Sequence, residues 1–164
     1  VVRCNGFVGQ APLLEFLHKE GQCADMEGEK LSGSQVAQAV QVASRELDLS
    51  IDCFMAVPVR RDGQTPYYAL LVERAMIDDA MTARQFIRIV DRELVQQNVM
   101  YAGKRNDRYI DTPQLVRLAP GTWAGFKAEQ NRRSGTGDSQ YKHPVLVTDT
   151  SMLDRFHPLD TITA

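Results

Sequence analysis

The sequence predicts an α+β fold of the ferredoxin-like kind, with a split βαβ sheet and helices packed on one face. From Gln22 onward, strand-type alternation and helix-type periodicity follow the order strand, helix, strand, strand, helix, strand. Both helical stretches have an apolar stripe that needs a sheet to cover it. The chain has 164 residues, of which 43% are hydrophobic, so it has material for one core and is too short for two full domains.

The first elements are predicted to be short strands that stand apart from this pattern. One strand runs near residues 1–8 and a second near 13–19, separated by glycine and proline, and a third lies around 22–27. The opening VVRCNGFV has the pattern of a strand already under way, which indicates a piece of a longer protein. We therefore expect a hinge strand pair over residues 1–21 and a C-terminal α+β domain over 22–164.

A helix and a β-hairpin come next. Ser32 and Gln35 have the spacing of a capping box, in which each side chain accepts a hydrogen bond from the backbone of the other residue. This spacing predicts a helix over residues 34–47. Its apolar face consists of Val36, Val40, Ala43 and Leu47. Residues 51–59 then alternate, an Asp-Gly turn follows, and residues 67–73 return as the second strand of the hairpin.

A second helix is predicted to begin at Thr82, with Gln85 in the capping-box position three residues later. Its apolar face consists of Phe86, Ile89, Val90 and Leu94. A last strand over residues 115–119 completes the sheet. Beyond this strand we expect a tail, made of a short helix over 122–131, a glycine-rich loop, a brief strand in HPVLVT and a final turn in SMLDRF.

The charge and hydropathy of the chain disfavour two classes of partner. Its net charge is −2 and its pI is near 5.9, so no basic field attracts nucleic acid or an anionic membrane. No apolar run approaches the length of a membrane span, and no signal peptide precedes the first strand. We therefore expect a cytoplasmic protein without nucleic-acid or membrane partners.

The chain has three cysteines and three histidines: Cys4, Cys23, Cys53, His18, His143 and His157. Their spacing fits neither a disulfide framework nor a zinc site, so we predict reduced thiols and no metal site. No Ser/His/Asp or Cys/His order nominates a nucleophile. Neither GxxxxGK[ST] nor GxGxxG is present, so the domain is not a nucleotide binder of either common type.

The segment SGTGDSQYKHP is the strongest candidate for a functional site. It places Lys142 between the rings of Tyr141 and His143, just before Pro144 and after the glycine-bracketed residues 135–137. The glycines allow backbone angles closed to other residues, whereas the proline fixes the chain immediately beyond the lysine. This arrangement suits a cation delivered to a phosphate or carboxylate. The alternative is a solvated lysine on a surface loop.

Two other charged segments are candidates for an anion site. Residues 97–113 form a long loop whose basic residues are Lys104, Arg105 and Arg108. Loops of this length are often functional, but the loop could equally be an ordered connector in which Tyr101 and Tyr109 pack on the sheet while the basic residues face water. The EGEKLS turn at 27–32 places carboxylates at the start of a helix, where we expect solvated charges rather than an acid/base pair.

Several motifs together resemble one family. In order, these are GFVGQAPLLEFLHKEGQ, EGEKLS opening a helix, NVMYAGKR, PGTW and SQYKHP. With this order and spacing, nearly the whole chain resembles the C-terminal domain of the auxin-responsive (Gretchen Hagen) acyl-acid amido synthetases. These adenylate-forming enzymes use a large N-terminal domain to make an acyl-adenylate from ATP and a carboxylic acid. A small C-terminal domain rotates over the site, and an amine takes the acyl group.

The resemblance implies a role for each matching residue. Lys142 matches the adenylation lysine, which reaches the nucleotide phosphate and the substrate carboxylate. Lys19, Gln140 and Tyr141 match positions that bind the nucleotide. ATP and Mg²⁺ would be held mainly by the N-terminal adenylation domain, so the isolated chain is expected to be inactive. The family usually has arginine where Lys19 and Val145 stand here, which indicates a divergent member.

The sequence leaves some alternatives open. A non-catalytic, ferredoxin-like binding or regulatory module derived from the same architecture is the second reading, because a fold does not by itself imply a function. The acyl acid, the oligomeric state and the choice between an amine and coenzyme A as acceptor are not determined by these residues.

Overall fold

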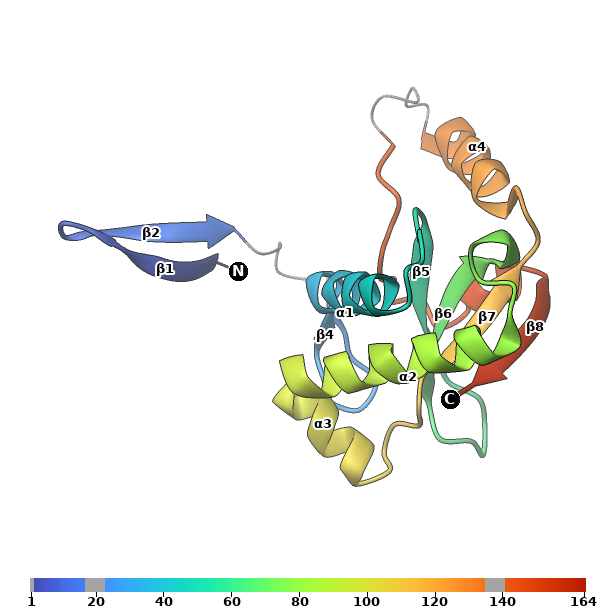
Figure 1. Ribbon diagram of the computed structural model, residues 1–164, viewed down its shortest axis with the longest axis horizontal. Helices are drawn as coiled ribbons and strands as arrows, with labels where there is room; N and C mark the ends of the chain where they lie inside the picture. The colour runs from blue at the N-terminus through green and yellow to red at the C-terminus, as the bar shows by residue number, and fades with distance from the viewer. Residues whose placement is uncertain (1, 17–22, 135–140) are drawn as a thin grey trace.

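The structure is a computed structural model that describes residues 2–16, 23–134 and 141–164. Its body is built around a four-stranded sheet, and a two-stranded hairpin projects away from that body (Figure 1). The α+β class predicted from the sequence is confirmed.

The projecting hairpin consists of β1 (Val2–Val8) and β2 (Ala11–Phe16), paired antiparallel. Gly9 adopts a φ of 61° in the tight turn, which lets Ala11 pair with Val8. The second strand therefore begins two residues earlier than the predicted 13–19, and the last three residues of that prediction lie outside the described residues. Five large apolar side chains of this hairpin are exposed: Val2, Phe7, Val8, Leu13 and Leu14.

The main sheet has the order β5-β6-β7-β8, and its bounds are β5 (Phe54–Val59), β6 (Tyr67–Glu73), β7 (Gln114–Leu118) and β8 (Pro158–Thr163). The β5–β6 and β7–β8 pairs are antiparallel, whereas β6 and β7 are parallel. The predicted hairpin and the predicted last strand near 115–119 are both members. A parallel pair requires a crossover connection, and α2 supplies it.

The membership of the sheet differs from the predicted one at one strand. In place of a strand over 22–27, β3 is only Cys23–Ala24, and it pairs with β4 (Leu31–Ser32) in a separate two-stranded sheet. The fourth place in the main sheet belongs to β8. This strand was missed because it lies at an edge, where mostly exposed residues give no alternating apolar pattern and Pro158 is tolerated.

The two main helices are α1 (Gly33–Glu46) and α2 (Ala80–Gln97). The predicted capping box of α1 is confirmed, because the Ser32 hydroxyl accepts from the Gln35 N–H and the Gln35 side chain accepts from the Ser32 N–H. The predicted cap of α2 is wrong. Its N-cap is Asp79, whose carboxylate accepts from both the backbone N–H and the hydroxyl of Thr82.

Residues 97–113, predicted to be a loop, contain a helix. This helix, α3 (Val99–Asn106), begins after Asn98, whose side-chain oxygen accepts from the N–H groups of Met100 and Tyr101. Asn98 is both the C-cap of α2 and the N-cap of α3, so the chain changes direction at this residue. Two short 3₁₀ helices, η1 (Arg74–Met76) and η3 (Met152–Arg155), complete the described helical elements together with α4 (Thr122–Ser134).

Both faces of the sheet are covered. On one face, α1 and α2 pack against alternate residues of the strands, such as Ala56, Leu70 and Leu115. On the other face, Trp123 and Phe126 of α4 pack with the intervening residues, such as Val57. The sequence placed the helices on one face, which holds for α1 and α2, and the tail covers the second face (Figure 1).

Candidate functional site

The segment that carries Lys142 runs along the free edge of β5. The carbonyl of Val145 accepts from the N–H of Ala56 at 2.8 Å, and the N–H of Val147 donates to the carbonyl of Ala56 at 3.1 Å. This pairing is parallel and opposes Leu146 to Ala56. The strand predicted in HPVLVT is therefore present as a short bridge, and Figure 1 shows the chain descending beside β5. The backbone just beyond the lysine is fixed by these bonds.

His143 adds a second attachment to the same strand. Its Nε2 lies 3.0 Å from the carbonyl oxygen of Phe54, and its Nδ1 lies 2.9 Å from the Tyr141 hydroxyl. A carbonyl oxygen only accepts, so Nε2 carries the proton, and in the neutral ring Nδ1 accepts from Tyr141. The ring also packs edge-on against Trp123, with 4.7 Å between centroids. Burial lowers the pKa of His143, and this effect outweighs the opposing effect of the bond to Phe54.

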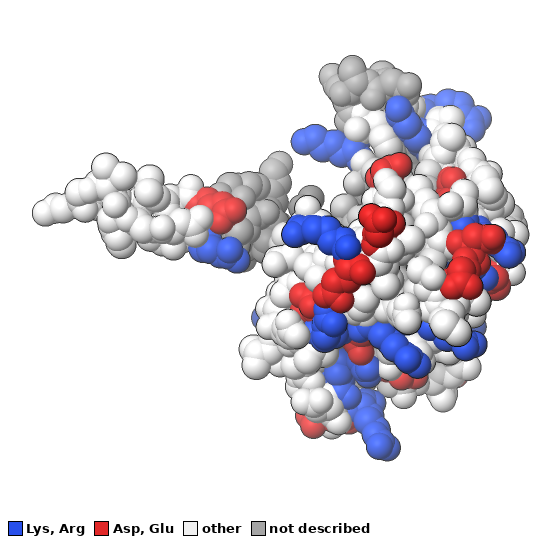
Figure 2. Space-filling model, in the orientation of Figure 1, with Lys and Arg blue, Asp and Glu red and all other residues white. Residues whose placement is uncertain are grey.

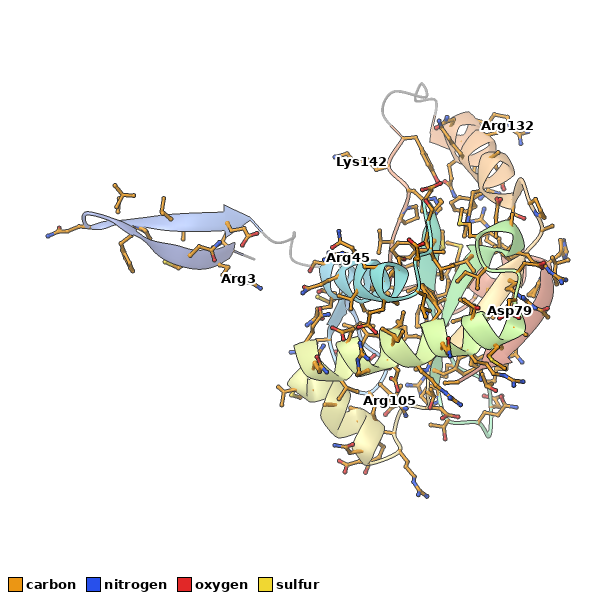
Figure 3. All side chains as sticks on the ribbon, in the orientation of Figure 1. Arg3, Arg45, Asp79, Arg105, Arg132 and Lys142 are labelled. Carbon is orange, nitrogen blue, oxygen red and sulfur yellow. The ribbon has the colours of Figure 1, made fainter. Side chains whose placement is uncertain are left out.

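Lys142 is exposed between these two attached residues. No described residue forms a hydrogen bond or ion pair with its side chain. Figure 3 shows the side chain pointing away from α4, on the same side of the body as Arg45. The ammonium group of Lys142 is thus available to an anion, and the residues that follow it are bonded to β5.

Tyr141, predicted to bind the nucleotide, is partly buried and has its hydroxyl committed to His143. The ammonium of Lys127 lies 5.8 Å from the centre of its ring. Burial raises the pKa of Tyr141, so the hydroxyl stays a donor. Its contact with a nucleotide remains a prediction. Lys19 and Gln140, the other two predicted nucleotide contacts, lie outside the described residues.

Two of the three basic residues predicted for an anion site in residues 97–113, Arg105 and Lys104, contact neighbouring side chains. The Arg105 guanidinium forms a two-point ion pair with Asp91, at 2.9 and 3.1 Å, and also donates to the Ile110 carbonyl and to Thr112. Lys104 lies over the ring of the exposed Tyr109. An open hollow of about 500 Å³ lies beside Arg105 and Arg108. Because the N–H groups of Arg105 already donate to these acceptors, its main role is structural: it holds α2 and the turn after α3 together.

Glu29 was predicted to be a solvated charge, and that prediction is wrong. Its side chain is fully buried. The carboxylate accepts from the N–H groups of Met26 and Glu27, at 2.9 and 2.8 Å, and from the Tyr68 hydroxyl. Its own carbonyl accepts from Asn98 at 2.9 Å. Two of these bonds close a local turn and two come from distant elements, so the sequence near Glu29 gave no signal of its burial.

The described residues offer little to a metal ion. Within residues 2–16, 23–134 and 141–164, no group of three or more His, Cys, Asp or Glu side chains could hold one. Acidic and basic side chains are interspersed over the face shown in Figure 2, and no large field of one sign covers it. Among the described helices, none combines the length and apolar character that a membrane crossing needs.

Comparison with known proteins identifies the family. The sequence profile described as "GH3 family C-terminal domain" matches residues 34–151, well over half of the chain. The chain belongs to the GH3 family. This match covers α1, the main sheet through β7, and the segment that contains Lys142. The resemblance drawn from the motifs is therefore confirmed at the level of the family and of the domain.

Solved structures support the same fold. The GH3.15 acyl acid amido synthetase superposes with a TM-score of 0.76 at 20% identity, over 98% of this GH3 chain and 29% of the other. AtGH3.15 acyl acid amido synthetase in complex with 2,4-DB gives a TM-score of 0.71 at 18% identity, over 98% and 30%. This chain thus spans less than a third of these relatives. No curated protein sequence matches it.

Proposed function

We propose that this chain is the mobile C-terminal domain of an ATP-dependent acyl-acid amido synthetase. In this proposal the enzyme adenylates a carboxylic acid and transfers the acyl group to an amine. Family membership supports the assignment, as does the similarity to structures that carry the name acyl acid amido synthetase. The rest of the catalytic machinery would belong to an N-terminal adenylation domain, and the location of the protein would be cytoplasmic.

One observation carries the proposal: Lys142 is exposed, unpaired by any described residue, and followed at once by backbone bonded to β5. Adenylation brings a carboxylate to the α-phosphate, where negative charge gathers as the bond forms. An ammonium about 4 Å away, at an effective dielectric of about 20, stabilises that charge by roughly 4 kcal/mol before desolvation. This corresponds to a rate factor on the order of several hundred.

ATP and Mg²⁺ fit this domain to different degrees. The ammonium of Lys142, which no described residue pairs with, suits a phosphate oxygen, and we propose Lys19, Gln140 and Tyr141 as further contacts to the nucleotide. Because the described residues lack a cluster of metal-binding side chains, Mg²⁺ would be held by the other domain and by the phosphates. When bound, ATP supplies the adenylyl group and the pyrophosphate leaving group.

Rotation of the domain would make the lysine available at one stage and withdraw it at the next. We propose that residues 1–21 and the turn that follows act as the hinge. The hairpin β1–β2 projects from the body, which agrees with a hinge that lies outside the core (Figure 1). Withdrawal would open the acyl-adenylate to the amine.

The test is ATP–pyrophosphate exchange with a panel of carboxylic acids, using the polypeptide as its gene encodes it. Lys142→Ala should lower the exchange rate by about a hundredfold or more. Lys104→Ala is the matched control, because it removes a lysine whose ammonium lies over the Tyr109 ring. Exchange that is indifferent to Lys142, or absent with every acid, would instead favour a non-catalytic binding or regulatory module.

A further inference from the structure

We infer that His143 is a positioning residue for Lys142, which fixes the backbone on which the lysine ammonium is delivered. The inference rests on the proposed function, because it assigns His143 a part in the same adenylation step. His143 would not touch the substrate. It would act through the residue before it in the chain.

The geometry leaves the imidazole ring one arrangement. Its two nitrogens contact Phe54 of β5 and Tyr141, while its edge meets Trp123 of α4, so three separate parts of the chain hold it. The ring of Phe126 lies near as well, at 6.1 Å between centroids. A side chain with both polar atoms bonded and two aromatic rings beside it cannot change rotamer without breaking several contacts.

The position of Lys142 follows from its two neighbours. Tyr141 and His143 are both partly buried and bonded to each other, whereas Lys142 between them is exposed. In an extended chain successive side chains point to opposite sides, so anchoring both neighbours toward the body directs the lysine outward. The lysine therefore has a defined starting point, and only its own four-carbon side chain remains free to move.

The two hydrogen bonds also have a fixed direction. The Phe54 carbonyl requires a proton on Nε2, and the Tyr141 hydroxyl then donates to a bare Nδ1. A protonated ring would place N–H groups at both ends, and Tyr141 would lose its acceptor. The lowered pKa of His143 agrees with a ring that is neutral at neutral pH. A residue that only filled space beside Trp123 would need neither nitrogen.

The first arm of the test measures the tautomer in the 164-residue chain. Nitrogen-15 NMR of the three histidines, with the His143 signal assigned by its loss in His143→Gln, should show the Nε2–H form at neutral pH. Tyr141→Phe should keep this tautomer, because Phe54 still accepts, while shifting the Nδ1 signal. A ring protonated on Nδ1, or one that averages between tautomers, overturns the geometry on which the inference depends.

The second arm measures ATP–pyrophosphate exchange in the full polypeptide. His143→Phe keeps an aromatic ring against Trp123 but loses both hydrogen bonds, and it should lower kcat about tenfold with little change in KM for the acid. His143→Gln can still donate to Phe54, so it should recover activity to within about threefold of wild type. Equal activity of His143→Phe and wild type overturns the inference.

A double variant separates positioning from a general loss of structure. In a Lys142→Ala background, His143→Phe should cause no further loss, because the group that it positions is gone. If His143→Phe lowers the exchange rate as much in the Lys142→Ala background as in wild type, the positioning role of His143 is overturned while the proposed function stands. An unaffected Lys142→Ala single variant overturns the proposed function and the role of His143 with it. If His143→Phe does not fold, His143→Leu, which also removes both hydrogen bonds but has a smaller side chain, replaces it in the same cycle.

Discussion

Two charged residues of this domain, Glu29 and Lys142, are treated in opposite ways. Glu29 is fully buried, and its carboxylate accepts from two backbone N–H groups and the Tyr68 hydroxyl. Lys142 is exposed, and no described residue bonds to its ammonium. In both regions the neighbouring backbone is anchored, at Glu29 by the charged group itself and at Lys142 by the residues around it.

The contrast separates structural charges from available ones. The carboxylate of Glu29 accepts hydrogen bonds from the protein itself, so removing it should lower the stability of the fold. The ammonium of Lys142 is exposed to solvent, whereas His143 and Val145 are bonded to β5. Removing the lysine should therefore lower activity without changing stability. Each of the following substitutions tests whether a residue contributes to stability, as Glu29 should, or to activity, as Lys142 should.

Glu29→Ala should have the largest effect on stability. It leaves two backbone N–H groups and a tyrosine hydroxyl without an acceptor in a buried site, at a cost of about 3–5 kcal/mol in the free energy of unfolding. Glu27→Ala is the matched control from the same turn, because Glu27 pairs with the exposed Arg60 and should cost less than about 1 kcal/mol. Urea denaturation measures both. Similar values for the two variants would contradict the distinction.

Arg105→Ala should come second. The guanidinium is largely buried and pairs with Asp91 at two points, so its removal should cost about 2–3 kcal/mol. Arg92→Ala, which removes a surface pair with Glu46, should cost at most about 1 kcal/mol. Thermal unfolding compares the two. If Arg105→Ala were stable but lowered ATP–pyrophosphate exchange, the residue would belong with Lys142.

Ser32→Ala should destabilise the domain by about 1 kcal/mol, because it removes the N-cap of α1. Ser32→Thr keeps an acceptor oxygen and should recover most of this loss. The measurement is the denaturation midpoint of each variant. An alanine variant as stable as the threonine variant would show that the turn around Glu29, rather than the cap, determines where α1 begins.

The stability contributed by the buried, neutral ring of His143 should fall in acid. Burial lowers the pKa of His143 below its ordinary 6.5, so the unfolded chain binds more protons near that pH. The stability from the neutral ring is therefore fully present above 6.5 and is lost as the pH falls through the lower folded value. The neighbouring groups are the Tyr141 hydroxyl, the Lys127 ammonium near it and the uncharged rings of Trp123 and Phe126.

The measurement is the unfolding midpoint against pH for wild type and His143→Gln. The two profiles should run parallel above 6.5 and diverge below it, with the wild type losing more. The other two histidines are present in both proteins, so their contributions cancel in the difference. Profiles that stay parallel throughout would remove His143 as the titrating group.

Lys142→Ala should have the smallest effect on stability, within about 0.5 kcal/mol of wild type. The side chain is exposed and no described residue bonds to it, so its removal exposes nothing that was buried. The same variant is expected to show the largest loss of ATP–pyrophosphate exchange. A clear fall in the unfolding midpoint would mean that the lysine supports the fold and is not simply available.

The parts of the fold that depend on local sequence could be predicted. The Ser32 and Gln35 side chains bond within one helical turn, and the short, mostly apolar segments of β5 and β6 on either side of an Asp-Gly turn are typical of a β-hairpin. The start of α2 was misplaced because Met81 is exposed and the cap is Asp79, three residues before the threonine that carried the expected pattern. The helix α3 was missed because most of its residues are polar or small.

The candidate site was only partly predictable for the same reason. Lys142, its flanking rings and the proline are adjacent in the sequence, so the pattern was visible. The partner of His143 is the backbone of Phe54, and a carbonyl group carries no sequence signal. Glu29 was misjudged because Tyr68 and Asn98 reach it from far along the chain. Long-range hydrogen bonds decide which charges are buried, and a single sequence does not show them.

The short bridge between Leu146 and Ala56 also affects how the protein behaves in a crowded solution. Residues 145–147 cover the outer edge of β5, a strand whose side chains are almost all buried. A bare edge of this kind is a template for strands of other molecules and promotes aggregation. The segment that presents the lysine therefore also shields the sheet, so a large displacement of this segment would favour self-association. In the proposed function, delivery of the lysine by rotation of the whole domain would avoid that hazard.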